Sequence, residues 1–344
     1  MMQHLNTLFV TLEGAWLFKD GQAVEVRHER ETKLRVPLHN LDGIVCLGWD
    51  IGASAQLMAA CAEAGVTLSF CSPHGKFLAA ATGFASGNVL LRRTQYRLAD
   101  DPVASTSIAR NIVAAKIAGS RTSLLRGARD RPDDPASAQL KTAADWLGHR
   151  IDVVLREQSL EVVRGIEGDS AAAYFNLLPA LLTVGDPAFA MNGRNRRPPL
   201  DPVNALLSFL YALLAHDCRS ALAAAGLDPA VGFLHRDRPG RPSLALDLME
   251  EFRPVLADRL ALALLNRKQL DNSDFDRREN GAVSLREDSR KKVLVAWQER
   301  KREELIHPFL LEKVPWGIVP HLQARLLARH LRGDLDAYPA FIWK

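Results

Sequence analysis

The stretch Gly83-Phe84-Ala85-Ser86-Gly87-Asn88 divides the sequence into two parts of different character. Its glycines and small residues are typical of a flexible link. Before it, apolar and polar residues alternate as they do in strands, and after it this alternation gives way to long helical patterns. We therefore expect an N-terminal β domain over residues 1–82, a linker and first helix over residues 83–100, and a helical domain over residues 101–344.

The N-terminal part is predicted to be a small, mostly antiparallel β domain. Asp20-Gly21 is a strong hairpin signal between expected strands at Ala15–Phe18 and Ala23–Arg27. One helix interrupts the strands, with Ser54 as its N-cap and Gly65 at its end. That helix is expected at Ala55–Ala64, and further strands at Asn6–Leu12, Leu34–Pro37, Gly43–Leu47, Val66–Cys71 and Lys76–Ala81.

The C-terminal part is predicted to be all-α, so the fold class is α+β with the helical domain the larger. Asp201-Pro202 marks the clearest helix start, and Gly226 stands just past the end of that helix. Arginine-bearing loops are expected at Gly185–Leu200 and Leu270–Ala282. Helices are expected at Ala104–Arg129, Ala136–Arg156, Leu160–Leu182, Pro202–Ala225 and Ser243–Asn266.

Composition indicates a soluble, cytoplasmic protein of two domains. The 344 residues exceed what one hydrophobic core usually supports, and 47% are apolar against 24% charged. No apolar run reaches the roughly 18 residues that a bilayer requires, and the N-terminus lacks signal-peptide features. Four cysteines without a CxxC pair are expected to be buried free thiols. Residues 1–85 carry six Lys and Arg against eight Asp and Glu, so the +6 of the remainder favours an anionic partner there.

Glu167 is the first candidate for chemistry, because Gly165 and Gly168 surround it. Each glycine costs a helix roughly 1 kcal/mol. A helix that keeps both is expected to allow close approach of another group to its backbone. Two alternatives stay open: Asp169 or Ser170 caps a new helix that begins just after Glu167, or Glu167 is a surface residue at a helix junction.

His235 is the second candidate. It follows two apolar residues and opens a loop with Arg236, Arg238 and Arg241 around a Pro-Gly turn. Such a loop suits a site that faces an anionic substrate. A histidine in this position is also typical of a satisfied structural group, so the loop alone does not decide between the two.

The acidic pair Asp247 and Glu250 is the third candidate. Residues three apart project from one face of a helix. Two carboxylates on a largely apolar helix are costly to bury unless they bind a cation or pair with arginine. Arg253, three residues after Glu250, offers such a pair. A metal site and a structural ion pair therefore both remain open.

The three candidates together form a hard ligand set. Two carboxylates and one imidazole suit Mg²⁺ or Mn²⁺. Such an ion activates a water or a 3′-hydroxyl and neutralises charge on a phosphodiester, while neighbouring arginines hold phosphates. The predicted catalytic and metal-binding residues are Glu167, His235 and Glu250, with Asp247 as an accessory ligand; the predicted DNA-binding residues are Arg164, Arg236, Arg238, Arg241 and Arg253.

Two other functions compete with this interpretation. A non-catalytic DNA-bridging scaffold would use the arginine loops for binding and the acids only as their partners. A helical phosphohydrolase would use His216-Asp217, a dipeptide that binds metal in such enzymes. The sequence offers no matching ligands upstream or downstream of that dipeptide.

The three candidate segments resemble the CRISPR-associated endonuclease of spacer acquisition, the integrase that is named first among the Cas proteins. The resemblance extends over essentially the whole chain, since a small β domain followed by a larger helical domain is that family's layout. It is carried by Glu167-Gly168 with Ala172 and Tyr174, by Phe233-Leu234-His235, and most specifically by Leu246-Asp247-Leu248-Met249-Glu250-Glu251-Phe252-Arg253-Pro254.

The resemblance implies a metal bound by Glu167, His235 and Glu250, with Asp247 matching a supporting acid. The family's variation at the last position leaves the share between Asp247 and Glu250 open. The resemblance also implies a symmetric homodimer formed through the β domains, and two such dimers bridged by a small ferredoxin-like second Cas protein. That assembly would join the 3′-hydroxyls of a double-stranded protospacer to the first CRISPR repeat.

Overall fold

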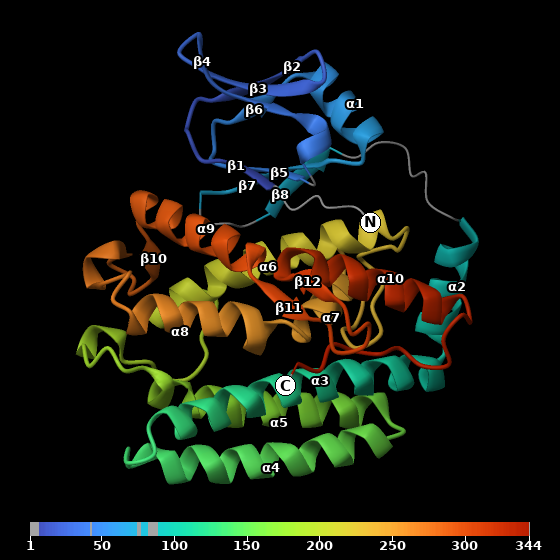
Figure 1. Ribbon diagram of the computed structural model, residues 1–344, viewed down its shortest axis with the longest axis vertical. Helices are drawn as coiled ribbons and strands as arrows, with labels where there is room; N and C mark the ends of the chain where they lie inside the picture. The colour runs from blue at the N-terminus through green and yellow to red at the C-terminus, as the bar shows by residue number, and fades with distance from the viewer. Residues whose placement is uncertain (1–6, 42, 74–76, 82–88, 344) are drawn as a thin grey trace. The chain divides into compact units, whose positions relative to one another are not determined.

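The computed structural model describes residues 7–41, 43–73, 77–81 and 89–343, so the Gly83–Asn88 stretch lies outside the described residues. The chain groups into two units (Figure 1). The first unit combines residues 1–87 with 290–303 and 315–318, and the second holds residues 88–289, 304–314 and 319–344. Residues 290–303 group with the first unit, whereas the composition predicts that they belong to an uninterrupted helical domain.

The first unit contains two four-stranded sheets, with strand orders β1-β5-β7-β8 and β4-β3-β2-β6. β5 runs parallel to β1 and β7, and β2 runs parallel to β6. The expectation of a mostly antiparallel domain was therefore wrong. In the β5–β7 pair, α1 supplies the crossover that parallel strands require. The strands are β1 (Thr7–Val10), β2 (Trp16–Asp20), β3 (Ala23–His28), β4 (Glu31–Pro37), β5 (Gly43–Leu47), β6 (Gly52–Ala53), β7 (Thr67–Cys71) and β8 (Phe77–Ala81), and the helix is α1 (Ala55–Ala64).

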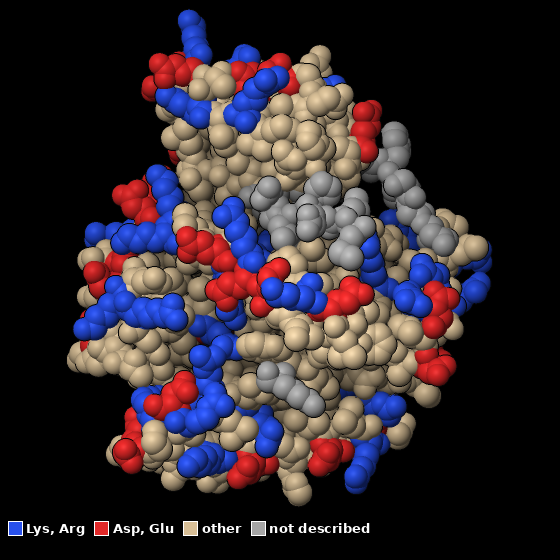
Figure 2. All heavy atoms as spheres, viewed as in Figure 1, with Lys and Arg blue, Asp and Glu red and all other residues tan. Residues whose placement is uncertain are grey.

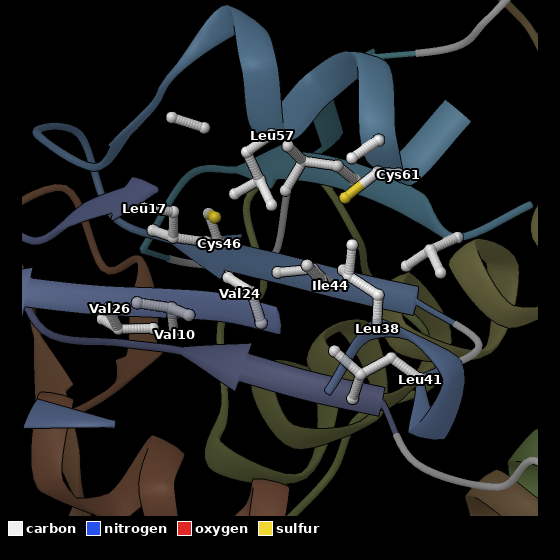
Figure 3. Packing of buried hydrophobic residues seen from close by; sticks show 14 of the residues in the cluster. Val10, Leu17, Val24, Val26, Leu38, Leu41, Ile44, Cys46, Leu57 and Cys61 are labelled. Atoms are coloured by element: carbon white, nitrogen blue, oxygen red, sulfur yellow. The ribbon is translucent and has the colours of Figure 1, made fainter. Parts of the chain in front are cut away.

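Local signals in this unit are confirmed. β2 and β3 form an antiparallel hairpin in which Gly21 takes the positive φ of 58° that the turn requires. α1 begins at Ser54, whose hydroxyl accepts from Leu57 N, and ends at Gly65 in the left-handed region. Figure 3 shows side chains of the strands and of α1 meeting in one apolar core. Cys46 and Cys61 lie in that core, and all four cysteines are free and buried.

Long helices form most of the second unit, and α3, α4 and α5 run side by side in Figure 1. Asp101 and Asp201 accept backbone N–H bonds at the starts of α3 and α6, each followed by proline at the first helical position. The helices are α2 (Val89–Asp100), α3 (Pro102–Asp130), α4 (Ala136–Arg156), α5 (Leu160–Leu177), α6 (Pro202–Ala224), α7 (Ser243–Glu250), α8 (Arg259–Asn266) and α10 (Val319–Leu331); α9 (Glu287–Arg302) lies mostly in the first unit.

Two expectations for this region were wrong. It is not all-α, because β9 (Phe275–Arg277) pairs with β10 (Val283–Leu285) and β11 (Glu304–Ile306) pairs with β12 (Lys313–Pro315). The helix expected over Ser243–Asn266 is also broken: α7 ends at Glu250, a π-helical segment η4 spans Arg253–Asp258, and α8 follows. Pro254 explains the break, because it lacks a backbone N–H and its ring clashes with the preceding turn.

The outer surface is charged and mixed. On the face shown in Figure 2, Lys and Arg side chains stand among Asp and Glu side chains. Within the part of the chain that the structure describes, no helix is long and apolar enough to cross a membrane.

Candidate active site

The three predicted ligands come together in the second unit from three different elements. Glu167 lies on α5, His235 on the loop between α6 and α7, and Glu250 on the last turn of α7. His235 Nε2 is 3.8 Å from Glu250 Oε1. The ammonium of Lys116, on α3, contacts the carboxylates of both Glu167 and Glu250. The predicted residues are therefore neighbours, and the two carboxylates share a lysine that the sequence did not single out.

A close helix contact brings Lys116 to this position. Gly119 lies about one turn after Lys116 on α3, and a Cβ there would stand 2.9 Å from Val255 Cγ1 and 3.3 Å from Pro254 Cβ. Any side chain at Gly119 would push α3 away from η4. The glycine thus lets α3 lie against the segment that follows α7, within reach of the end of that helix.

Asp247 orients the imidazole of His235. It is 0% exposed, and its Oδ2 accepts from Phe233 N at 2.6 Å and Leu234 N at 2.9 Å. Its Oδ1 accepts from His235 N at 2.9 Å and lies 2.7 Å from Nδ1 of the same residue. A carboxylate that only accepts leaves Nδ1 as the donor, so Nε2 presents its lone pair. A Cβ at Gly232 would be 2.7 Å from Asp247 Oδ2, so this arrangement requires glycine there.

Glu250 is a buried but ionised carboxylate. It is 1% exposed, with Oε1 2.6 Å from Arg253 Nη1 and Oε2 2.7 Å from Lys116 Nζ. Burial raises the pKa of Glu250, but the charges of Arg253 and Lys116, the two largest lowering effects, outweigh burial and the pKa is held at about 2. The contact of Lys116 with Oε2 is an ion pair, and among the described residues Oε2 accepts no well-directed hydrogen bond. Of the two oxygens of Glu250, Oε2 is thus the one whose contact is less well directed.

The donor set fits a hard divalent cation, although its members are not yet in a ligating arrangement. Among the described residues, no three His, Cys, Asp or Glu side chains stand positioned to share one ion. Lys116 and Arg253 contact the carboxylate oxygens of Glu250. Two carboxylates, one of them with an oxygen that lacks a directed hydrogen bond, and an imidazole lone pair are the ligands that Mg²⁺ and Mn²⁺ accept.

The helix around Glu167 is continuous. α5 runs from Leu160 to Leu177, so Asp169 does not cap a new helix. Gly165 and Gly168 are exposed, and a Cβ at either would meet no described atom within 4 Å. The space that these glycines leave beside Glu167 is thus not filled by any described part of this chain.

Three of the five predicted arginines are engaged within the chain. Arg164 Nε donates to Leu234 O at 2.6 Å, and its guanidinium also pairs with Glu161. Arg236 Nη2 is 2.7 Å from the other oxygen of Glu161. Arg253 forms an ion pair with Glu250 at the end of α7. These residues tie the His235 loop and η4 to their neighbours.

Arg238 and Arg241 differ from the other three, because neither has a side-chain hydrogen bond or ion pair with any described residue. The pKa of Arg241 is lowered by burial and by the like charges of Arg238, Arg196 and Arg197. Arg196 and Arg197 belong to the arginine-bearing loop that the sequence predicts. Four arginines therefore concentrate positive charge that an anion would relieve.

The His216-Asp217 dipeptide of the competing phosphohydrolase hypothesis lies on α6, and its histidine is buried.

Comparison with known proteins shows the family of the chain. Residues 8–299 match the family model described as CRISPR associated protein Cas1. A protein of Chlorobaculum tepidum named CRISPR-associated endonuclease Cas1 is 50% identical over 344 residues, 100% of each chain. A solved casposase bound to its integration product has a TM-score of 0.83 at 22% identity, covering 98% of this chain and 94% of that chain. A chain of a Cas6-RT-Cas1–Cas2 complex also has a TM-score of 0.83, at 21% identity, covering 99% of this chain and 36% of that chain.

The fold and the full-length likeness define a class, the CRISPR-associated endonucleases. Within that class, the chain belongs to the Cas1 family. The resemblance inferred from the three sequence segments is thereby confirmed.

Proposed function

We propose that this chain is a metal-dependent DNA endonuclease and integrase that inserts short foreign DNA into a CRISPR array. The reaction is attack of a DNA 3′-hydroxyl on a phosphodiester. The observation that supports the proposal most strongly is that Glu167, His235 and Glu250, from three elements, lie next to one another. Lys116 contacts both carboxylates, and His235 Nε2 is 3.8 Å from Glu250 Oε1. The endonuclease name of the Chlorobaculum relative and the integration product of the casposase point to the same chemistry.

Glu167, His235 Nε2 and Glu250 Oε2 would hold Mg²⁺ or Mn²⁺. When bound, the ion neutralises charge on the phosphodiester and lowers the pKa of a coordinated hydroxyl or water. Asp247 has all of its described contacts within the protein, so we assign it to positioning His235 rather than to metal binding. Arg253 keeps Glu250 ionised at its buried position.

The DNA would be the double-stranded protospacer and the CRISPR repeat, bound through phosphates. Arg238 and Arg241 are the best placed of the five predicted arginines, since the other three have partners within the chain. Gly165 and Gly168 leave open surface beside Glu167 where a strand could pass. A protein that acts on cellular DNA is expected in the cytoplasm.

The assembly would be a homodimer formed through the first unit, with two dimers bridged by a small ferredoxin-like second Cas protein. The Cas6-RT-Cas1–Cas2 complex, which contains a chain of this fold, motivates that partner. Light scattering of the chain alone and mixed with the second Cas protein tests the proposal. A monomer that forms no complex at micromolar concentration would contradict it.

The enzymatic proposal is tested by joining a duplex with free 3′-hydroxyls to a plasmid that carries the array, with Mn²⁺ or Mg²⁺. Glu167→Gln, His235→Ala and Glu250→Gln should each abolish joining, and so should a chelator. Asp169→Asn is the matched control, because Asp169 lies on the same helix as Glu167, with its side chain 70% exposed. Joining retained in all three site variants would overturn the proposal. DNA binding that weakens with salt and ignores the chelator would instead favour the scaffold function.

A further inference from the structure

Lys116 stands where the two carboxylates of the candidate active site meet. It is 6% exposed, and its ammonium bridges Glu167 and Glu250, whose helices are otherwise separate elements. An ion pair this buried is seldom gained for stability alone, because removing two charges from water costs as much as their attraction returns. The lysine lies in the apolar stretch Ile112–Gly119, where a single charge is unusual.

The positions of the cations show which contact can be exchanged. Arg253 holds Oε1 of Glu250 through a short three-residue connection on the same segment. Lys116 holds Oε2 from another helix, without a well-directed hydrogen bond among the described residues. A compact ammonium on a flexible four-carbon stem leaves a carboxylate more readily than a guanidinium does. Oε2 is therefore the oxygen that can pass from one cation to another.

A divalent ion and the ammonium cannot share these oxygens. Both would contact Glu167 and Glu250, and two like charges at contact distance in a buried site repel strongly. The arrangement also accounts for the lack of a ready ligand group among the described residues, since the lysine draws the carboxylates onto itself.

We infer that Lys116 is a built-in counter-ion that the metal must displace. In the metal-free protein its ammonium neutralises the two buried carboxylates and holds α3, α5 and α7 together. When a divalent ion binds, the ammonium leaves the carboxylates, and part of the metal's binding free energy is spent on breaking these ion pairs. This inference rests on the proposed metal site at Glu167, His235 and Glu250.

The direction in which Mn²⁺ affinity changes when Lys116 is substituted distinguishes this role from a structural one. Lys116→Met should bind Mn²⁺ about tenfold more tightly than the wild type in calorimetric titration of the full-length protein without DNA. The same variant, free of metal, should unfold at a lower temperature, because Glu250 and Glu167 lose a compensating charge. Saturating Mn²⁺ should raise the unfolding temperature of the variant more than that of the wild type. Loss of a lysine with only a packing role would leave Mn²⁺ affinity unchanged or weaken it.

Two further variants complete the experiment. Lys141→Met makes the same change at an exposed position on α4 and should leave Mn²⁺ affinity at the wild-type value. Lys116→Gln keeps a donor for the carboxylates without the charge, and it should show the same tightening if Lys116→Met does not fold. The inference is overturned if the folded Lys116 variants bind Mn²⁺ with unchanged or weaker affinity. If the wild type binds Mn²⁺ and Glu250→Gln removes that binding, the proposed metal site still stands. If Mn²⁺ binds neither the wild type nor the Lys116 variants, the proposed metal site itself fails.

Discussion

Two buried acids follow one another at the end of α7, and their surroundings are opposite in kind. Around Glu250 the neighbours are cations, Arg253 and Lys116, and they hold its pKa at about 2 against the effect of burial. Around Glu251 the neighbours are neutral donors, and burial raises its pKa to about 7. These donors are Tyr338 Oη at 2.6 Å, Phe341 N at 2.6 Å and Gln323 Nε2 at 3.0 Å.

The comparison shows how one helix end serves two purposes. Consecutive residues on a helix project in directions about 100° apart, so Glu250 and Glu251 enter different surroundings. The acid among cations stays charged and can exchange partners. The acid among neutral donors fastens the C-terminal residues Tyr338 and Phe341 to α7. The chemical type of the neighbour, and not the degree of burial, separates a candidate ligand from a structural acid.

The largest expected effect comes from making the same change at both acids. Glu250→Gln should lower the rate of DNA joining by about 10³-fold, because it removes the charge that the metal requires. Glu251→Gln should leave the joining rate within a few-fold of wild type, since the amide oxygen can accept from Phe341 N and Gln323 Nε2 while the amide NH2 donates to the Tyr338 hydroxyl. Joining assays at saturating Mn²⁺, with circular dichroism to confirm folding, measure both. Equal losses at the two positions would break the comparison.

The pH dependence of stability tests a second buried acid with a raised pKa, Asp258. Burial raises its pKa to about 6, while its bond from Tyr211 at 2.7 Å and the nearby Tyr174, Arg194 and Arg253 oppose that rise. A raised acid pKa means that the folded state holds its proton more tightly than the unfolded state. Its contribution is complete near pH 4 and is lost as the pH rises through about 6.

Asp258→Asn should remove this dependence. Between pH 4 and pH 7 the wild type should lose on the order of 3 kcal/mol of unfolding free energy relative to the variant. Urea denaturation of both proteins across this range measures the difference, and other titrating groups cancel because the two chains share them. A constant difference at all pH values would show that Asp258 is charged in the folded protein.

Asp247→Asn tests whether Asp247, the third acid discussed near the end of α7, positions His235 or binds the metal. Asparagine cannot accept from both Phe233 N and His235 Nδ1 as the carboxylate does, so the imidazole loses its fixed tautomer. Loss of such a partner behind a metal ligand typically costs 10–100-fold, and we expect about this loss in Mn²⁺ affinity. Calorimetric titration measures it. A complete loss of binding, equal to that of Glu250→Gln, would make Asp247 a ligand instead.

The sequence singled out three of the residues that meet at the candidate site, because each lies in a locally unusual segment. Glu167 stands between glycines, His235 opens an arginine loop, and Glu250 interrupts an apolar helix. Lys116 was missed although its apolar surroundings were a signal, because its role depends on Gly119 letting another segment approach. Contacts of that kind join residues distant in the sequence, and no local pattern records them.

The fold likewise has features that local residues predict and features that depend on distant contacts. The helix Ala55–Ala64 was predicted with its correct ends, because Ser54 and Gly65 act on neighbouring backbone groups. The parallel pairing of β5 with β7 was not predicted, since strand alternation shows which face is buried but not which strand lies alongside. The break at Pro254 was visible in the sequence, and giving it more weight would have ended the expected helix at α7.

The smallest expected effect has opposite signs for stability and for function. Gly168 lies within α5, is exposed, and has no described atom within 4 Å of a built Cβ. Gly168→Ala should therefore stabilise the fold by about 0.5–1 kcal/mol, because alanine is the better helix former. If DNA passes beside Glu167, the added methyl group should also weaken DNA binding at unchanged Mn²⁺ affinity. Urea denaturation and fluorescence anisotropy measure the two effects, with Gly165→Ala as a second probe of the same open face. Higher stability without weaker DNA binding in either variant would place the DNA path away from this face of α5.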